Sequence, residues 1–89
     1  MAWKIEWSKA ASRDLQELGS VEKRRIIDFM ERRVSPQDDP RLLGRPVIGG
    51  KLGHLFRYRV GDYRIIASVQ DATVTILVVA VGHRREVYR

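Results

Sequence analysis

The stretch that decides the fold reads Leu55-Phe56-Arg57-Tyr58-Arg59-Val60-Gly61-Asp62-Tyr63-Arg64-Ile65-Ile66. Two runs rich in β-branched and aromatic residues flank Gly61-Asp62, and glycine at the first position of a two-residue turn favours a type II′ hairpin. In that register Arg59 lies opposite Arg64, and opposed residues share a face of the sheet. The hairpin therefore predicts one face carrying Arg57, Arg59 and Arg64 and another carrying Phe56, Tyr58, Ile65 and Ala67.

The sequence before the hairpin predicts one strand and two helices. Residues 3–7 alternate between apolar and charged side chains, as in a short strand. Ser8 can cap a helix over residues 8–18, Gly19 ends it, and Ser20 can cap a second helix over residues 21–34. Residues 36–53 are predicted to be loop. The strands expected after it are residues 55–60, 63–69 and 73–80.

The predicted order of elements is β-α-α-β-β-β. This order is typical of an α+β domain, in which a curled, mainly antiparallel four-stranded sheet carries a two-helix hairpin packed on one face. The polar and basic residues 82–89 are expected to cover the open side of the sheet. With 89 residues and no internal repeat, residues 1–89 are predicted to form a single domain.

Composition excludes several classes of protein. The chain has no cysteine and two histidines, which excludes a disulfide scaffold, a thiol nucleophile and a histidine-rich metal centre. We expect no metal and no other cofactor. The longest apolar run, residues 76–81, is far shorter than the ~18 residues of a membrane span, and charges interrupt residues 1–7, unlike a signal peptide. A cytoplasmic protein with no membrane partner is expected.

The net charge of +6 lies mostly in the second half of the chain. Residues 1–44 carry nine basic and eight acidic side chains, whereas residues 45–89 carry eight basic and three acidic ones. Thirteen of the 17 basic residues are arginine, whose guanidinium suits bidentate contact with phosphate. The excess of basic residues predicts a polyanionic partner, although a solubilising basic surface would explain the composition equally well.

The arginine face of the hairpin is the strongest candidate site. Arg59 and Arg64 repel each other when directly opposed, so three arginines on one face favour an anion site over a solvated face whose charges pair with a distant carboxylate such as Glu86. The tail adds Arg84 and Arg85.

Two further tail residues allow alternative interpretations. Tyr88 can stack on a base while arginines hold phosphates, or it can pack the tail onto the domain. His83 is a candidate general acid or base, while a hydrogen-bonded structural role is the more common one for a lone histidine.

Taken together, these residues resemble the RelE branch of the RelE/ParE toxin superfamily. The resemblance covers essentially the whole chain and rests on the order of elements, on the R-x-G-x-Y-R hairpin (59–64) and on the V-G-x-R…V-Y tail (81–88). It implies a toxin of a bacterial type II toxin–antitoxin system that enters the ribosomal A site and cleaves mRNA there.

The resemblance also implies roles by position. Arg57 falls where the family often has a catalytic lysine or arginine, Arg64 and Arg84 match phosphate-contacting arginines, and Tyr88 matches a tyrosine near the C-terminus. The residues expected to bind RNA beside these are Arg59, Lys51, Arg85 and His83.

One departure from the family pattern concerns the general base. Leu55 stands where the family can carry another lysine, and arginine is a poor base because it stays protonated. Lys51, His54, His83 or a ribosomal group are the candidates.

The implied chemistry uses the substrate's own nucleophile. An RNA 2′-hydroxyl attacks the adjacent phosphate, leaving a cyclic phosphate and a free 5′-hydroxyl, and clustered guanidinium groups stabilise the developing charge without a metal. The implied partners are a RelB-like antitoxin that covers the basic face, the ribosome and mRNA. Operator DNA is expected to be contacted only through the antitoxin.

Two alternatives stay open at this point. A ParE-like toxin shares the fold but acts by binding DNA gyrase. A non-catalytic basic module would bind structured RNA by charge alone. Val87-Tyr88, and Arg57 with Arg64 on one face, favour the RelE branch.

Overall fold

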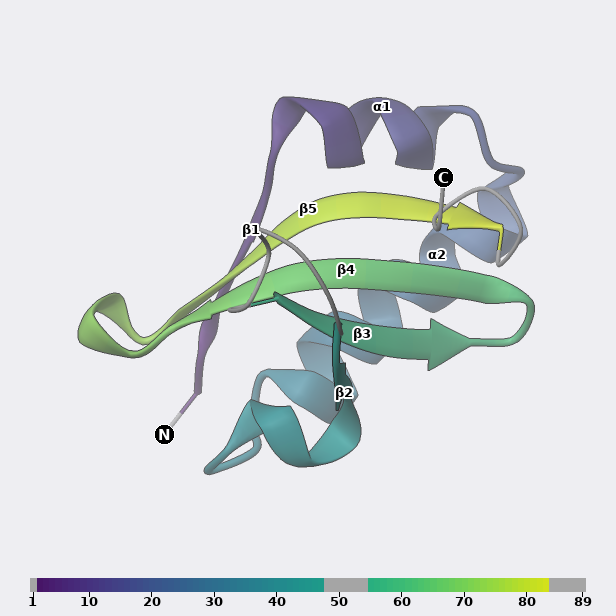
Figure 1. The fold of residues 1–89 in the computed structure, drawn as a ribbon. Coiled ribbons are helices and arrows are strands. Elements are labelled where there is room, and N and C mark those ends of the chain that lie inside the picture. The colour runs from purple at the N-terminus through teal and green to yellow at the C-terminus, as the bar shows by residue number, and fades with distance from the viewer. Residues whose placement is uncertain (1, 48–54, 84–89) are drawn as a thin grey trace.

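The computed structural model describes residues 2–47 and 55–83, which form a five-stranded sheet with helices on one face (Figure 1). The strands are β1 (Lys4–Trp7), β2 (Arg45–Pro46), β3 (Leu55–Val60), β4 (Tyr63–Gln70) and β5 (Thr75–His83). They lie in the order β1-β5-β4-β3-β2, with β1 parallel to β5 and every other neighbouring pair antiparallel. The predicted α+β fold is confirmed, with five strands in place of the expected four.

The additional strand lies in the segment that the sequence predicted to be loop. A short 3-10 helix, η2 (Pro40–Leu43), leads into β2, which pairs with β3 through Arg45 opposite Arg57 and Pro46 opposite Phe56. Val47 N then donates to Leu55 O at 2.9 Å. A two-residue strand has no periodicity to reveal it, and proline is tolerated here because β2 is an edge strand.

The two helices begin and end close to the predicted positions. In α1 (Lys9–Gln16) the expected cap is confirmed, because Ser8 Oγ accepts a hydrogen bond from Ala11 N at 3.0 Å. The predicted cap of the second helix is wrong: Ser20 is the first residue of α2 (Ser20–Asp28), and Gly19 occupies the N-cap position without a side-chain bond.

The second helix changes type before it ends. It continues from α2 as a π-helix, η1 (Phe29–Val34), in which Ser35 N donates to Met30 O at 2.9 Å. Ser35 also holds the start of β1, since Ser35 Oγ donates to Trp3 O at 2.6 Å and Trp3 N donates to Ser35 O at 2.8 Å. The wider turn thus joins the end of the helix to the beginning of the sheet.

The core lies between the helices and one face of the sheet. The helices contribute Ala11, Leu15, Ile26, Met30 and Val34, and the strands contribute Tyr58, Ile65, Ala67, Val69, Ile76, Val78 and Val81. The predicted packing of a two-helix hairpin on one face is therefore confirmed. Among the described residues, no helix covers the opposite face.

A bulge in β5 changes which residues face the helices. Ile66 pairs with Ala80 and Ala67 pairs with Val78, which leaves Val79 as an extra residue. The backbone groups around it bond to the N-terminal helix: Ser8 Oγ donates to Val79 O at 3.3 Å, and Asp14 Oδ2 accepts from Val81 N at 2.9 Å.

The limits of the last strand differ from the prediction. A 3-10 turn, η3 (Asp71–Thr73), precedes β5, which runs on to His83. The expectation that residues 82–89 cover the open face is therefore wrong for Gly82 and His83, which belong to the sheet, while residues 84–89 lie outside the described residues.

Candidate functional site

The hairpin has the register expected from its turn. Arg59 lies opposite Arg64 and Arg57 lies opposite Ile66. Gly61 has a φ of 58°, the positive value that a type II′ turn requires at its first central position. Arg57, Arg59 and Arg64 therefore share the face of the sheet that faces away from the core.

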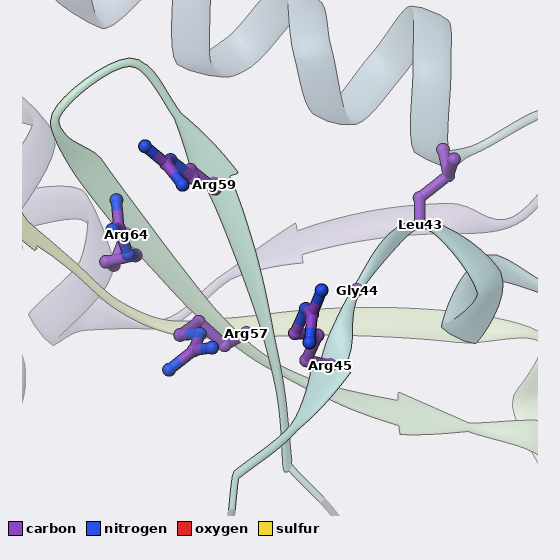
Figure 2. Close-up of a pocket in the computed structure, with 6 residues that line it drawn as sticks. All are labelled: Leu43, Gly44, Arg45, Arg57, Arg59 and Arg64. Carbon is purple, nitrogen blue, oxygen red and sulfur yellow. The ribbon is translucent and has the colours of Figure 1, made fainter.

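Strand β2 adds a fourth arginine that the sequence analysis missed. Pairing with β3 places Arg45 directly opposite Arg57. Figure 2 shows the four arginine side chains around one hollow, with Leu43 and Gly44 completing its lining. We call it the arginine hollow; its residues are Leu43, Gly44, Arg45, Arg57, Arg59 and Arg64. The volume of the hollow is about 260 Å³.

The arginine hollow concentrates positive charge. It contains two cross-strand arginine pairs, Arg45 with Arg57 and Arg59 with Arg64, and like charges directly opposed on a sheet are destabilising. Within the described part of the chain, no carboxylate forms an ion pair with Arg45, Arg59 or Arg64. An anion bound in the hollow would relieve this repulsion, and phosphate matches the fork of donors on each guanidinium.

Tyr58 and Gly44 hold Arg45 beside Arg57. The Tyr58 side chain is fully buried and its hydroxyl donates to Pro40 O at 2.8 Å, which ties η2 to β3. Burial raises the pKa of Tyr58 to about 12, which extends the pH range over which its hydroxyl remains a protonated donor.

Gly44 lets the chain approach closely. A β-carbon at this position would lie 2.9 Å from Tyr58 Cε1 and 3.0 Å from Arg57 O, distances that ordinary packing does not allow. Only glycine therefore brings the residue before Arg45 against the backbone of Arg57.

Arg41 has a structural role that distinguishes it from the arginines of the hollow. Its guanidinium bonds to Asp39 Oδ1 at 3.2 Å and to the Asp71 carboxylate, and it lies 5.8 Å from the centre of the Phe56 ring. The hydrogen bond to Asp71 raises the pKa of Arg41. The residue links η2 to the connection between β4 and β5.

The structure separates His83 from the arginine hollow. His83 pairs with Tyr63, and their rings meet edge to face with centroids 5.9 Å apart. Both line a different hollow, whose volume is about 370 Å³. Its lining also includes Asp14 of α1 and Glu17, the residue at the C-terminal end of that helix. The residue opposite Arg64 is Gly82, which has no side chain to fill the space beside it.

Several expected site residues lie outside the described residues. They are Lys51, His54, Arg84, Arg85 and Tyr88. In residues 2–47 and 55–83, no group of three His, Asp or Glu side chains could hold a metal ion. The helices of that part of the chain are all too short or too polar to span a membrane.

Comparison with known proteins identifies the family. The family described as "ParE toxin of type II toxin-antitoxin system, parDE" matches residues 5–88 of this chain. The chain belongs to this toxin family. It is a type II toxin of the RelE/ParE superfamily, as its sequence predicted.

Relatives of this toxin include RelE-type proteins. It is 27% identical to Toxin RelG of Mycobacterium tuberculosis over 89 residues, which are 100% of this chain and 99% of RelG. The toxin–antitoxin complex RelBE2 of the same organism contains a chain with a TM-score of 0.84 and 24% identity, covering 97% of this toxin and 95% of that chain. An Escherichia coli RelE mutant in complex with a peptide of the antitoxin RelBc gives a TM-score of 0.74 and 21% identity, covering 99% and 92%.

Proposed function

We propose that this toxin is an mRNA endonuclease of the RelE type, which cleaves mRNA in the ribosomal A site and thereby inhibits translation. The observation that carries the proposal is the arginine hollow: three strands bring four arginines together on a face that lies away from the core. Such a cluster has a cost in stability that a phosphate ligand would offset.

In the proposed reaction the RNA supplies its own nucleophile. The 2′-hydroxyl attacks the adjacent phosphorus, the bond to the 5′-oxygen of the next nucleotide breaks, and a 2′,3′-cyclic phosphate and a 5′-hydroxyl result. Arg57 and Arg64 contact the scissile phosphate and stabilise the charge that develops on its oxygens. Arg84 contacts the scissile phosphate together with Arg57 and Arg64. Arg45 and Arg59 hold neighbouring phosphates.

The other proposed roles belong to residues outside the arginine hollow. Tyr88 stacks on the base beside the scissile bond. Arg85 binds the RNA backbone. The arginines cannot accept the 2′-hydroxyl proton because guanidinium stays protonated, so the base is Lys51, His54 or a ribosomal group. The geometry lends no support to His83 in this role, since its side chain lies with Tyr63 on the helix-covered face.

The proposed protein partner is a RelB-like antitoxin. Solved neighbours of this chain are RelE toxins in complex with RelB-type antitoxins, which supports a partner of that kind. An antitoxin that covers the arginine hollow must bring carboxylates, because burying guanidinium groups without added negative charge would be costly. We place the toxin in the cytoplasm with the ribosome, and assign any contact with operator DNA to the antitoxin.

A second candidate function is supported by the family model, which describes ParE toxins. A ParE-like toxin would inhibit DNA gyrase and would not cleave RNA. A supercoiling assay with purified gyrase tests this alternative directly. Inhibition at toxin concentrations that leave programmed ribosomes unaffected would favour it over the endonuclease.

The proposed cleavage can be tested on ribosomes programmed with a defined mRNA. We expect fragments that end in a 2′,3′-cyclic phosphate and begin with a 5′-hydroxyl, and no cleavage of an mRNA with a 2′-deoxynucleotide at that position. Arg64→Ala should lower the rate about 10²–10³-fold, as loss of one transition-state donor does. Arg13→Ala is the matched control, because Arg13 is an exposed arginine on α1, away from the hollow.

Binding without these fragments would point to a non-catalytic RNA-binding module. Cleavage of the deoxy-substituted mRNA would refute the attack by the 2′-hydroxyl. Wild-type cleavage by folded Arg64→Ala protein would remove this residue from the site.

A further inference from the structure

A second set of cations lies on the helix that runs through α2 and η1. Five exposed basic residues occur there: Lys23, Arg24, Arg25, Arg32 and Arg33. In the described part of the chain, none of the five forms an ion pair, although Glu22, Asp28 and Glu31 lie on the same helix. No ion pair in that part of the chain therefore neutralises their charges.

Three of these arginines border one groove. Its lining comes from helix positions that share a face by their spacing of three, four, seven and eight residues, and from one residue of β3. We call it the basic groove; its residues are Arg25, Asp28, Phe29, Arg32, Arg33 and Val60. Its volume is about 360 Å³.

The basic groove meets the arginine hollow at the tip of the β3–β4 hairpin. The Arg25 guanidinium lies against Gly61, where a β-carbon would be 3.4 Å from Arg25 Nη2. Arg59 and Arg64 form the second cross-strand pair from this turn, on the other face of the sheet. Cations thus lie on both sides of the hairpin tip, where Asp62 is the one carboxylate of the turn, so a polyanion bound in the hollow lies close to the groove.

The spacing of the arginines suits a nucleic-acid backbone. Arg25 and Arg32 are seven residues apart, which corresponds to roughly 10 Å along a helix. Each strand of a DNA duplex advances about 3.4 Å per phosphate along its axis, so two arginines this far apart can reach different phosphates of a nucleic-acid backbone. Arginine presents its donors in the fork that phosphate binds bidentately.

We propose that the basic groove is a second RNA-binding surface, which docks the toxin on the phosphate backbone of ribosomal RNA while the arginine hollow holds the mRNA. This inference rests on the proposed function. Docking by the groove would raise the affinity for the ribosome and leave the rate of the cleavage step unchanged, because the groove contacts no reacting atom.

The test compares two double variants that remove the same charge. Arg32→Gln with Arg33→Gln changes the basic groove. Lys9→Gln with Arg13→Gln is the matched control, because these residues are also exposed cations of a helix, without ion pairs among the described residues, and Arg13 lies in the last turn of its helix as Arg32 and Arg33 do. Binding to programmed 70S ribosomes is measured over a range of salt concentrations, and cleavage is measured separately at saturating toxin.

We expect the groove variant to bind ribosomes about tenfold or more weakly than wild type at low salt. The slope of log K against log salt should become shallower by about 1.5–2, since each lost phosphate contact removes about 0.7–0.9. The cleavage rate at saturation should match that of wild type. The control variant should differ little from wild type in all three measurements.

Two results would overturn the inference. One is a groove variant with the same affinity and salt slope as the control. The other is a groove variant that loses affinity for the antitoxin and keeps its affinity for ribosomes, which would assign the groove to an acidic protein segment. Failure of the proposed function has a different signature, because wild-type toxin itself would then either not bind ribosomes, as expected of a gyrase inhibitor, or bind them without cleaving mRNA.

Discussion

Replacing Tyr58 with phenylalanine removes one hydroxyl from the interior and tests how the arginine hollow is held. The hydroxyl donates to Pro40 O at 2.8 Å, at a side chain with no exposed surface. Leaving a buried carbonyl without its donor costs about 1–3 kcal/mol. Since 1 kcal/mol changes the melting temperature of a domain of this size by about 4–8 °C, we expect a decrease of roughly 4–24 °C at pH 7.

The same variant should alter how stability depends on pH. The pKa of Tyr58 is about 12 in the folded protein, against an ordinary value of 10. Between these values the unfolded chain releases the proton and the folded protein keeps it, so stability falls as the pH rises. The pKa shift of about two units lowers the free energy of unfolding by about 2–3 kcal/mol by pH 12. The phenylalanine variant lacks this loss, so the advantage of the wild type should shrink above pH 10.

Urea unfolding followed by tryptophan fluorescence, from pH 7 to pH 11.5, measures both effects. Tyr63→Phe is the control, because Tyr63 is only half-buried and its hydroxyl has no hydrogen bond among the described residues. Stabilities of wild type and Tyr58→Phe that stay parallel across this range would refute the raised pKa. An equal loss of stability in Tyr63→Phe at pH 7 would refute the role of the bond to Pro40.

Three further predictions concern the site itself. Arg45→Ala should lower single-turnover cleavage about tenfold or more without lowering the melting temperature, because it also removes repulsion from Arg57; unchanged cleavage would exclude Arg45 from the site. Gly44→Ala should lower both cleavage and stability, the latter by about 1–3 kcal/mol in urea unfolding, since its β-carbon would meet Tyr58; wild-type values would refute the close approach. Stacking by Tyr88 predicts that Tyr88→Phe keeps most of the cleavage rate and Tyr88→Ala does not; normal cleavage by both would make it a structural residue.

The hairpin could be predicted to the residue because its determinants are local. Gly61 selects the turn, the turn selects the register, and the alternation of side chains places Arg57, Arg59 and Arg64 on one face. The Ser8 cap is local in the same sense, since its hydroxyl reaches a backbone group only three residues away.

Strand β2 could not be predicted because its pairing is not local. Arg45 and Arg57 are twelve positions apart, and two residues are too few for any alternation to show. What holds Arg45 in place lies elsewhere in the chain: the hydroxyl of Tyr58 and the close approach at Gly44. The fourth arginine of the hollow is thus decided by tertiary contacts.

The sequence by itself determined that an arginine-rich hairpin lies in an α+β domain, since composition, turn chemistry and periodicity are properties of neighbouring residues. Only the tertiary structure decided where His83 points. Simple alternation from Ile76 and Val78 would put His83 on the arginine face, but the bulge at Val79 shifts the register by one residue. Because side chains alternate with a period of two, that shift turns Val81 into the core and His83 to the helix-covered face.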